Sequence, residues 1–186
     1  MPLTKWLNRT NLRRLFGLFW FDFVWFAAVF GRNDWLLFST AMVAAQCVVA
    51  AYFGTFAQRR FWPIATLLFV LGLALELTVV GLGIIRFDGG VMPLWLVVLW
   101  VGFVLMCLTT LDGFGGRPWL AALLGLGFGP VTYAVGVEMQ AAELLAPVWQ
   151  LWVIYAALWA VYMVIFAKLV VKVGEPVHEP EPSPNP

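Results

Sequence analysis

The chain has 186 residues, of which 63% are hydrophobic, 17% aromatic and only 11% charged. A typical soluble domain is about 45–50% apolar and about 25% charged, so this composition excludes a conventional water-covered globule. The net charge is +1, and no basic patch is large enough to hold a phosphate backbone, which excludes a nucleic-acid binder. The composition therefore predicts a membrane protein surrounded by the lipid bilayer.

Six apolar segments are each long enough to cross a bilayer, which takes about 20 apolar residues. They cover residues 12–31, 35–57, 61–85, 91–111, 119–137 and 147–173. The breaks between them are short and rich in glycine and charged residues, which predicts that successive segments run antiparallel. The expected fold class is all-α: a polytopic integral membrane protein in which residues 1–173 form a bundle of six transmembrane helices.

The two ends of the chain differ in character. The first segment follows a basic stretch, as in a signal peptide, but its long apolar run is interrupted by Asp22 and lacks a small-x-small cleavage site. We therefore expect a retained helix. Residues 174–186 read GEPVHEPEPSPNP, a proline-rich acidic composition that predicts a disordered tail.

Lysine and arginine are distributed unevenly between the two predicted sides of the membrane. In a six-span arrangement both termini share one side, and nine of the eleven basic residues fall there. Only Arg32 and Arg86 fall on the other side. Because basic residues are enriched in cytoplasmic loops, both termini are expected in the cytoplasm.

Two carboxylates lie inside the predicted spans, Asp22 near the middle of the first and Glu76 past the middle of the third. A charge at the bilayer centre costs at least about 2.5–3.5 kcal/mol, so each carboxylate should face the bundle interior or water. The apolar segments offer neither of them an intramembrane lysine or arginine. Each carboxyl is therefore protonated, or the two approach and share a proton. Both a proton-accepting site and an interhelical hydrogen bond remain open as their role.

The fifth segment combines small residues with a proline. Gly125 and Gly129 form a small-xxx-small pair that lets helices approach closely, and Pro130 should kink the helix and free a carbonyl. Tyr133 offers a hydroxyl one turn further on. This segment is either tightly packed or part of a binding site, since broken helices are tolerated where they face protein or a cavity.

Aromatic residues recur in the sixth segment at steps of three and four, which predicts one continuous helix face about 25 Å long. They are Trp149, Trp152, Tyr155, Trp159, Tyr162 and Phe166. Such a face packs against helices or lipid, or it forms a wall along a lipid-like or polyene ligand. Trp152 and Trp159 are the candidate ligand contacts, and Gln46 in the second segment is a weaker polar candidate.

Catalytic and metal chemistry have little support. The sequence shows no nucleophile–base pair and no cofactor motif, so no catalytic residue or cofactor is assigned and an enzyme is poorly supported. The one histidine, His178, lies in the tail, and Cys47 and Cys107 sit inside apolar runs. No metal site is therefore expected.

Four stretches of the sequence carry a family resemblance. In order they are WFDFVWFAAVFG at 20–31, LGLALELTVVGLGIIRF at 71–87, PLWLVVLWVGF at 93–103 and AALLGLGFGPVTYAVG at 121–136. With them, residues 15–170 resemble the bacterial membrane-protein family catalogued as domain of unknown function 2878. The paired PLW…LW and the GP-x-x-Y-x-x-G are the most specific features. Residues 109–116 depart from the family pattern, so no role is carried over there.

The resemblance implies a small polytopic protein of the bacterial inner membrane whose biochemical role is not established. Family members often carry aspartate where Glu76 stands here, which implies that the carboxylate matters more than its length. Genes of the family tend to lie beside those of fatty-acid-modifying enzymes, which implies a link to lipids.

Three functions follow from these observations. The leading hypothesis is a protein that binds, transports or assists modification of a lipid or other hydrophobic molecule, with Glu76 and Asp22 supplying hydrogen bonds or a proton. The second is a proton-coupled transporter of a small solute that uses the same two carboxylates, since three helices per half permit an inverted repeat. The third is a structural subunit of a membrane enzyme complex, which would have a membrane-protein partner.

Overall fold

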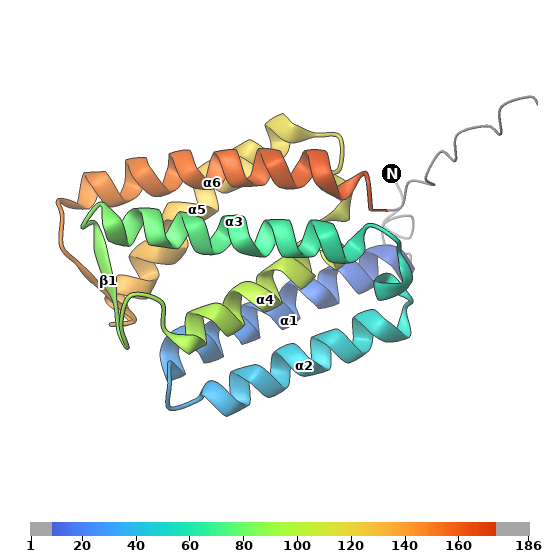
Figure 1. Ribbon diagram of the computed structural model, residues 1–186, viewed down its shortest axis with the longest axis horizontal. Coiled ribbons are helices and arrows are strands. Elements are labelled where there is room, and N and C mark those ends of the chain that lie inside the picture. The colour runs from blue at the N-terminus through green and yellow to red at the C-terminus, as the bar shows by residue number, and fades with distance from the viewer. Residues whose placement is uncertain (1–8, 174–186) are drawn as a thin grey trace, which may run out of the picture.

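The computed structural model describes residues 9–173 and shows helices running side by side along one long axis (Figure 1). In chain order the α-helices are α1 (Arg9–Gly31), α2 (Leu36–Tyr52), α3 (Phe61–Gly81), α4 (Leu94–Thr110), α5 (Pro118–Glu138) and α6 (Val148–Val170). Two short 3-10 helices, η2 (Thr55–Ala57) and η3 (Asp112–Phe114), lie in the connections. The all-helical class predicted from the sequence is confirmed.

The helices differ in length relative to a bilayer. Four are long and apolar enough to cross a membrane: α3, α5, α6 and the part of α1 from Asn11 onward. The apolar helices α2 and α4 have 17 residues each. At 1.5 Å per residue, 17 residues span about 25 Å, slightly less than the roughly 30 Å of hydrocarbon. The fold is thus that of a membrane protein with four helices of full spanning length.

Two predicted segments run past the observed helix ends. The second was expected to reach residue 57, but α2 ends at Tyr52, and Gly54 takes a φ of +70° before the chain tightens into η2. The third was expected to reach residue 85, but α3 ends at Gly81, and Gly83 takes a φ of +67°. A positive φ is easiest for glycine and ends an α-helix. The other helix ends agree with the prediction to within three residues.

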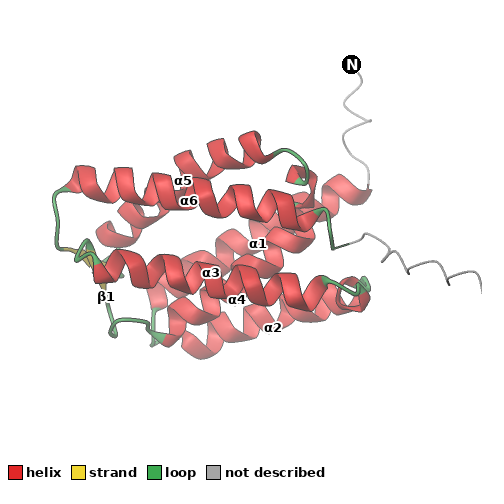
Figure 2. Cartoon of the chain, turned by 45° about the horizontal axis from the view of Figure 1, so that its top comes forward, coloured by secondary structure: helices red, strands yellow, loops and turns green. Residues whose placement is uncertain are grey.

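A two-stranded antiparallel ribbon joins two loops at one end of the bundle (Figure 2). It is formed by β1 (Ile85–Phe87) and β2 (Ala142–Leu144), with Arg86 opposite Glu143. These two side chains form an ion pair. The sequence analysis did not predict the ribbon because strands of three residues are too short to show a period of two.

Arg32 ties the same end of the bundle together. It follows α1 with a φ of +47°. Its Nε lies 3.1 Å from Oδ2 of Asp88, and its Nη1 donates to the carbonyl of Met139 over 3.0 Å. The loop after α1 is therefore linked to the loop after β1 and to the loop after α5.

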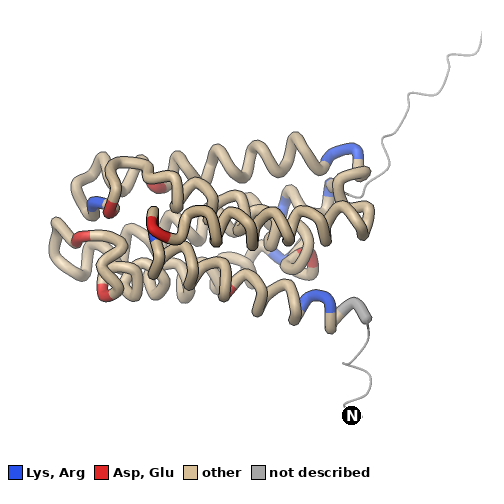
Figure 3. The backbone as a smooth tube through the Cα atoms, turned by 90° about the horizontal axis from the view of Figure 1, so that it is seen from below, with Lys and Arg blue, Asp and Glu red and all other residues tan. Residues whose placement is uncertain are grey.

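Lysine and arginine gather at the opposite end, where α1 begins and α6 ends (Figure 3). We call this the basic end, and the other the ribbon end. At the basic end Arg14 of α1 pairs with Asp112 of η3, with Nε 2.8 Å from Oδ1. The unequal charge at the two ends agrees with the distribution read from the sequence.

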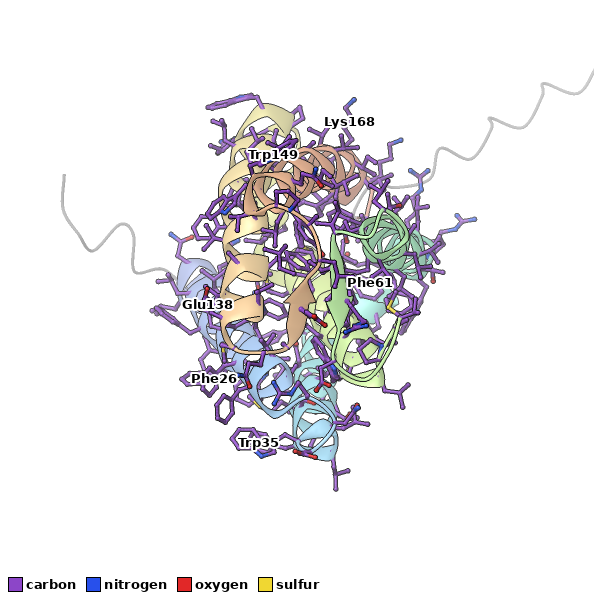
Figure 4. The ribbon with its side chains drawn as sticks, turned by 90° about the vertical axis from the view of Figure 1, so that its left-hand side faces the viewer. Phe26, Trp35, Phe61, Glu138, Trp149 and Lys168 are labelled. Carbon is purple, nitrogen blue, oxygen red and sulfur yellow. The ribbon has the colours of Figure 1, made fainter. Side chains whose placement is uncertain are left out.

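The helices pack in two groups with α3 between them. One group is α1, α2 and α4, which contact one another, and the other is the tightly paired α5 and α6. Helix α3 contacts α4 on one side and α6 on the other. Large apolar side chains such as Phe26, Trp35 and Trp149 lie at the periphery (Figure 4). An apolar exterior of this kind suits a lipid environment.

Helix α5 approaches α6 closely at two glycines. A Cβ atom on Gly125 would lie 2.5 Å from the carbonyl oxygen of Trp159, and one on Gly129 would lie 2.5 Å from Cγ of the same residue. Glycine at these positions therefore lets the two helices pack at short range. Helix α5 continues through Pro130 as one uninterrupted element.

This packing predicts unequal effects for two alanine substitutions on α5. Gly129→Ala should lower the free energy of unfolding by about 1–3 kcal/mol because its methyl group overlaps Trp159. Gly127→Ala is the matched control, since a Cβ there meets nothing within 4 Å, and it should be neutral or slightly stabilising. Thermal unfolding in detergent measures both. Equal unfolding midpoints for the two variants would contradict the close α5–α6 packing.

Candidate functional site

Glu76 of α3 is fully buried and joins four helices through hydrogen bonds. Its Oε1 accepts from Nε1 of Trp100 on α4 over 2.9 Å, and from the hydroxyl of Tyr133 on α5. Its Oε2 accepts from the hydroxyl of Tyr155 on α6 over 3.3 Å. We call these four residues the Glu76 cluster. A single carboxylate thus links α3 to one helix of the first group and to both helices of the second.

Ring stacking fixes the donors of the Glu76 cluster in place. The rings of Tyr133 and Tyr155 are stacked with centroids 3.6 Å apart, and those of Trp100 and Trp159 with centroids 5.6 Å apart. Gly72 leaves room for the Trp100 ring, which a Cβ at that position would overlap. Stacked aromatic pairs are worth about 0.5–1.5 kcal/mol beyond the area they bury. The donor groups are therefore held toward Glu76 by packing as well as by hydrogen bonding.

The charge of Glu76 is not balanced by a cation within residues 9–173. The ion pairs described above lie at the two ends of the bundle. The Trp100 indole can only donate a hydrogen bond, whereas the tyrosine hydroxyls can donate or accept. The cluster can therefore hold an ionised Glu76 that accepts three hydrogen bonds, or a protonated Glu76 that donates one to Tyr155.

Asp22 lies in a different environment from Glu76. Its side chain is exposed on α1, and within residues 9–173 it has no hydrogen-bond or ion-pair partner. The partners of Glu76 come from α4, α5 and α6, so the two carboxylates do not share a hydrogen bond. Of the two arrangements that the sequence left open, the shared proton does not occur in this structure.

Helices α1 and α5, which belong to different helix groups, have no extensive contact with each other. Two cavities lie between them. The one nearer the ribbon end has a volume of about 100 Å³, and its walls include Trp25, Trp95 and Tyr133. The one nearer the basic end has a volume of about 330 Å³, and its walls include Asp22. Both are lined by Phe21, Phe103, Thr132 and Trp159. We call the two cavities together the α1–α5 groove.

The α1–α5 groove opens sideways, and its walls are largely apolar. Leu18, Asp22 and Phe128 line it and are exposed on the outside of the bundle. The hydroxyl of Thr132 already donates to the Gly129 carbonyl over 2.8 Å. The Asp22 carboxylate and the indole N–H of Trp159, whose nitrogen is buried, are left without a hydrogen-bond partner in the described residues.

The structure divides the aromatic residues of α6 between two environments. Tyr155 and Tyr162 are buried, whereas Trp149 is 63% exposed and Trp152 is 42% exposed. An α-helix turns by about 100° per residue, so Trp149 lies about 120° around the helix from Tyr155. Trp149 therefore lies off the predicted face, whereas the other five aromatic residues share an arc of about 80°, of which the Trp152 edge is exposed. Trp159 lines the α1–α5 groove, and Trp152 does not.

Gln46 lies apart from the Glu76 cluster. It is buried between helices, and its Nε2 donates to the carbonyl of Gly102 on α4 over 3.1 Å. Trp100, by contrast, was not among the predicted site residues. A tryptophan near the middle of an apolar span brings an N–H group that needs an acceptor, and this signal could have identified it.

Among residues 9–173, no group of three His, Cys, Asp or Glu side chains could hold a metal ion.

Residues 14–165 match a family described as a protein of unknown function, DUF2878. The chain belongs to the DUF2878 family. The match spans both the Glu76 cluster and the α1–α5 groove of this DUF2878 protein. Comparisons with curated proteins and with solved structures give no match.

The two intramembrane carboxylates should respond differently to substitution. Glu76→Leu leaves three buried donors without an acceptor and should lower the free energy of unfolding by about 3–5 kcal/mol. Glu76→Gln keeps one acceptor oxygen and should cost less. Asp22→Asn removes a charge that has no partner and should change the free energy by less than about 1 kcal/mol. Detergent-based unfolding curves measure all three, and similar losses for Glu76→Leu and Asp22→Asn would refute this assignment.

Proposed function

We propose that this DUF2878 protein binds a hydrophobic molecule of the bilayer, a lipid or a similar amphiphile, in the α1–α5 groove. The observation that carries the proposal is a largely apolar groove, with aromatic residues in its walls, that opens sideways between two helix groups. Pockets for small molecules are typically apolar and aromatic with a few polar groups. Binding is the step that transport and assisted modification of a lipid have in common.

The two unpaired polar groups of the groove support a ligand that carries a polar atom within its apolar length. Asp22 offers acceptor oxygens, and Trp159 offers a donor. Unpaired polar groups in an apolar environment cost free energy that a ligand's own hydrogen bonds recover. A ligand hydroxyl both donates and accepts, so an alcohol group suits this part of the groove.

Glu76 supports the groove indirectly. Its bond to Tyr133 holds the tyrosine ring at the groove wall, while the carboxylate itself is fully buried and lines neither cavity. A proton-coupled transporter would need Glu76 to exchange protons with water during its cycle. Full burial and three hydrogen bonds favour a positioning role over that alternative.

We propose further that all six helices cross the bacterial inner membrane with both termini in the cytoplasm. A length of 17 residues for α2 and α4 lies at the lower limit for a transmembrane helix. In the sequence, nine of the eleven basic residues fall on the side that both termini share in a six-span arrangement, and such residues are enriched on the cytoplasmic side.

Reporter fusions test this topology. Alkaline phosphatase, which is active only outside the cytoplasm, should be active when fused after Gly90 and inactive when fused after Gly116. Green fluorescent protein should give the opposite pattern at the two positions. Active phosphatase at both positions, or only at Gly116, would contradict the proposed orientation.

A substitution that fills the groove tests the binding function. Gly136 lines the groove, and a Cβ there meets nothing within 4 Å, so the side chain of Gly136→Leu should enter the cavity of about 100 Å³. Gly127→Leu is the matched control on the exposed side of α5. Native mass spectrometry with lipid extraction should find a copurifying hydrophobic molecule in the wild type and in Gly127→Leu.

The bound molecule should be lost or strongly reduced in Gly136→Leu. Equal retention in the two leucine variants would place the molecule outside the groove and refute the proposal. A wild-type protein that purifies without any bound molecule would favour the structural-subunit alternative, and a search for membrane-protein partners would then come next.

A further inference from the structure

A second pocket lies at the basic end of the bundle, apart from the α1–α5 groove. It has a volume of about 140 Å³ between α1, α2 and α4, with Thr55 of the η2 turn in its wall. It shares no lining residue with the groove. Its exposed margin carries Arg13 and Phe53, and the buried Gln46 lies on its inner wall. We call it the Gln46 pocket.

Gln46, which lines this pocket, carries an unsatisfied acceptor. The side chain is 9% exposed, and its Nε2 donates a hydrogen bond to the Gly102 carbonyl over 3.1 Å. Its Oε1 is buried and has no hydrogen-bond partner in residues 9–173. A buried acceptor without a partner costs about 1–3 kcal/mol. The pocket therefore favours an occupant that donates hydrogen bonds.

Two buried threonines add hydroxyl groups to the walls. Thr55 is 8% exposed and Thr110 is 7% exposed, and both line the pocket. Thr110 Oγ1 lies 3.4 Å from the hydroxyl of Thr109. Hydroxyl groups both donate and accept hydrogen bonds. The inner part of the pocket can therefore recognise a small polar group.

Arg13 supplies a positive charge at the margin of the pocket. Its guanidinium lies 5.7 Å from the centre of the Phe53 ring. Arg13 has no ion pair among the described residues, whereas the neighbouring Arg14 pairs with Asp112. Arginine binds phosphate through paired N–H groups. The start of α1 lies at the basic end of the bundle (Figure 3), which the proposed topology places at the cytoplasmic surface of the bilayer, where phospholipid phosphates lie.

We propose that the Gln46 pocket binds the phosphate headgroup of a phospholipid that also carries hydrogen-bond donors, such as a glycerol headgroup. The phosphate pairs with Arg13, and a headgroup hydroxyl donates to Oε1 of Gln46. A choline headgroup does not fit this chemistry, because its quaternary ammonium has no N–H to donate. The site is thus selective for the headgroup, whereas the α1–α5 groove contacts the apolar part of its ligand.

Lipid titration of the full-length protein tests this assignment by native mass spectrometry in detergent, with phosphatidylglycerol and phosphatidylcholine of identical chains as probes. Phosphatidylglycerol should bind to the wild type about fivefold more tightly than phosphatidylcholine. Arg13→Gln should weaken phosphatidylglycerol binding about tenfold. Lys168→Gln is the matched control, because Lys168 is an exposed cation at the end of α6, and it should have less than a twofold effect.

Gln46→Leu separates headgroup recognition from attraction by charge. It should weaken phosphatidylglycerol binding about fivefold and leave phosphatidylcholine binding unchanged. Thr55→Val removes one hydroxyl at nearly constant shape and should act in the same direction if Gln46→Leu does not fold. Equal losses in Arg13→Gln and Lys168→Gln, or unchanged binding in folded Gln46→Leu, would overturn the proposal. Displacement of the lipid by free glycerol 3-phosphate would overturn the assignment to a lipid headgroup.

Discussion

The hydrogen bonds to Glu76 are the interaction on which the rest of the structure depends. Helix–helix association in a membrane gains little from the hydrophobic effect, so packing and polar contacts must supply it. Glu76 is fully buried and accepts hydrogen bonds from three residues on three other helices: Trp100, Tyr133 and Tyr155. Each bond alone is modest, at about 1–2 kcal/mol or less, but all of them end at one carboxylate. The cluster therefore joins the two helix groups at one point and fixes the tyrosine that lines the groove.

A groove follows from the way the two helix groups are joined. Glycines on α5 bring it against α6, and α4 packs against α1 and α2, while α1 and α5 have no extensive contact. At the ribbon end, Arg32 and the β1–β2 ribbon tie the loops of both groups together. The space between α1 and α5 is consequently framed at its end and open at its side. In the proposed function, an apolar molecule enters the groove through this open side without moving the buried cluster.

Composition and hydrophobic length were sufficient to predict an all-helical membrane protein and most helix boundaries, because a bilayer imposes a strict length on apolar segments. The same signal extended α2 and α3 too far, since apolar residues continue through the turns at Gly54 and Gly83. Glu76 stood out because a carboxylate is costly in lipid, but its partners depend on how distant helices pack. The α1–α5 groove was likewise invisible in the sequence, because it arises where two helices do not meet.

The most direct test of the binding groove is the contact between lipid chains and its walls in a bilayer. Nuclear Overhauser spectra report such contacts for protein in lipid nanodiscs that is deuterated except at the Thr132 methyl group, the Trp159 indole, the Tyr162 ring and the side chains of α1. We expect cross-peaks from both groups to lipid acyl-chain protons, and none from the buried ring of Tyr162. Cross-peaks from Thr132 and Trp159 only to side chains of α1 would show that α1 and α5 close against each other, and would contradict a hydrophobic binding site between them.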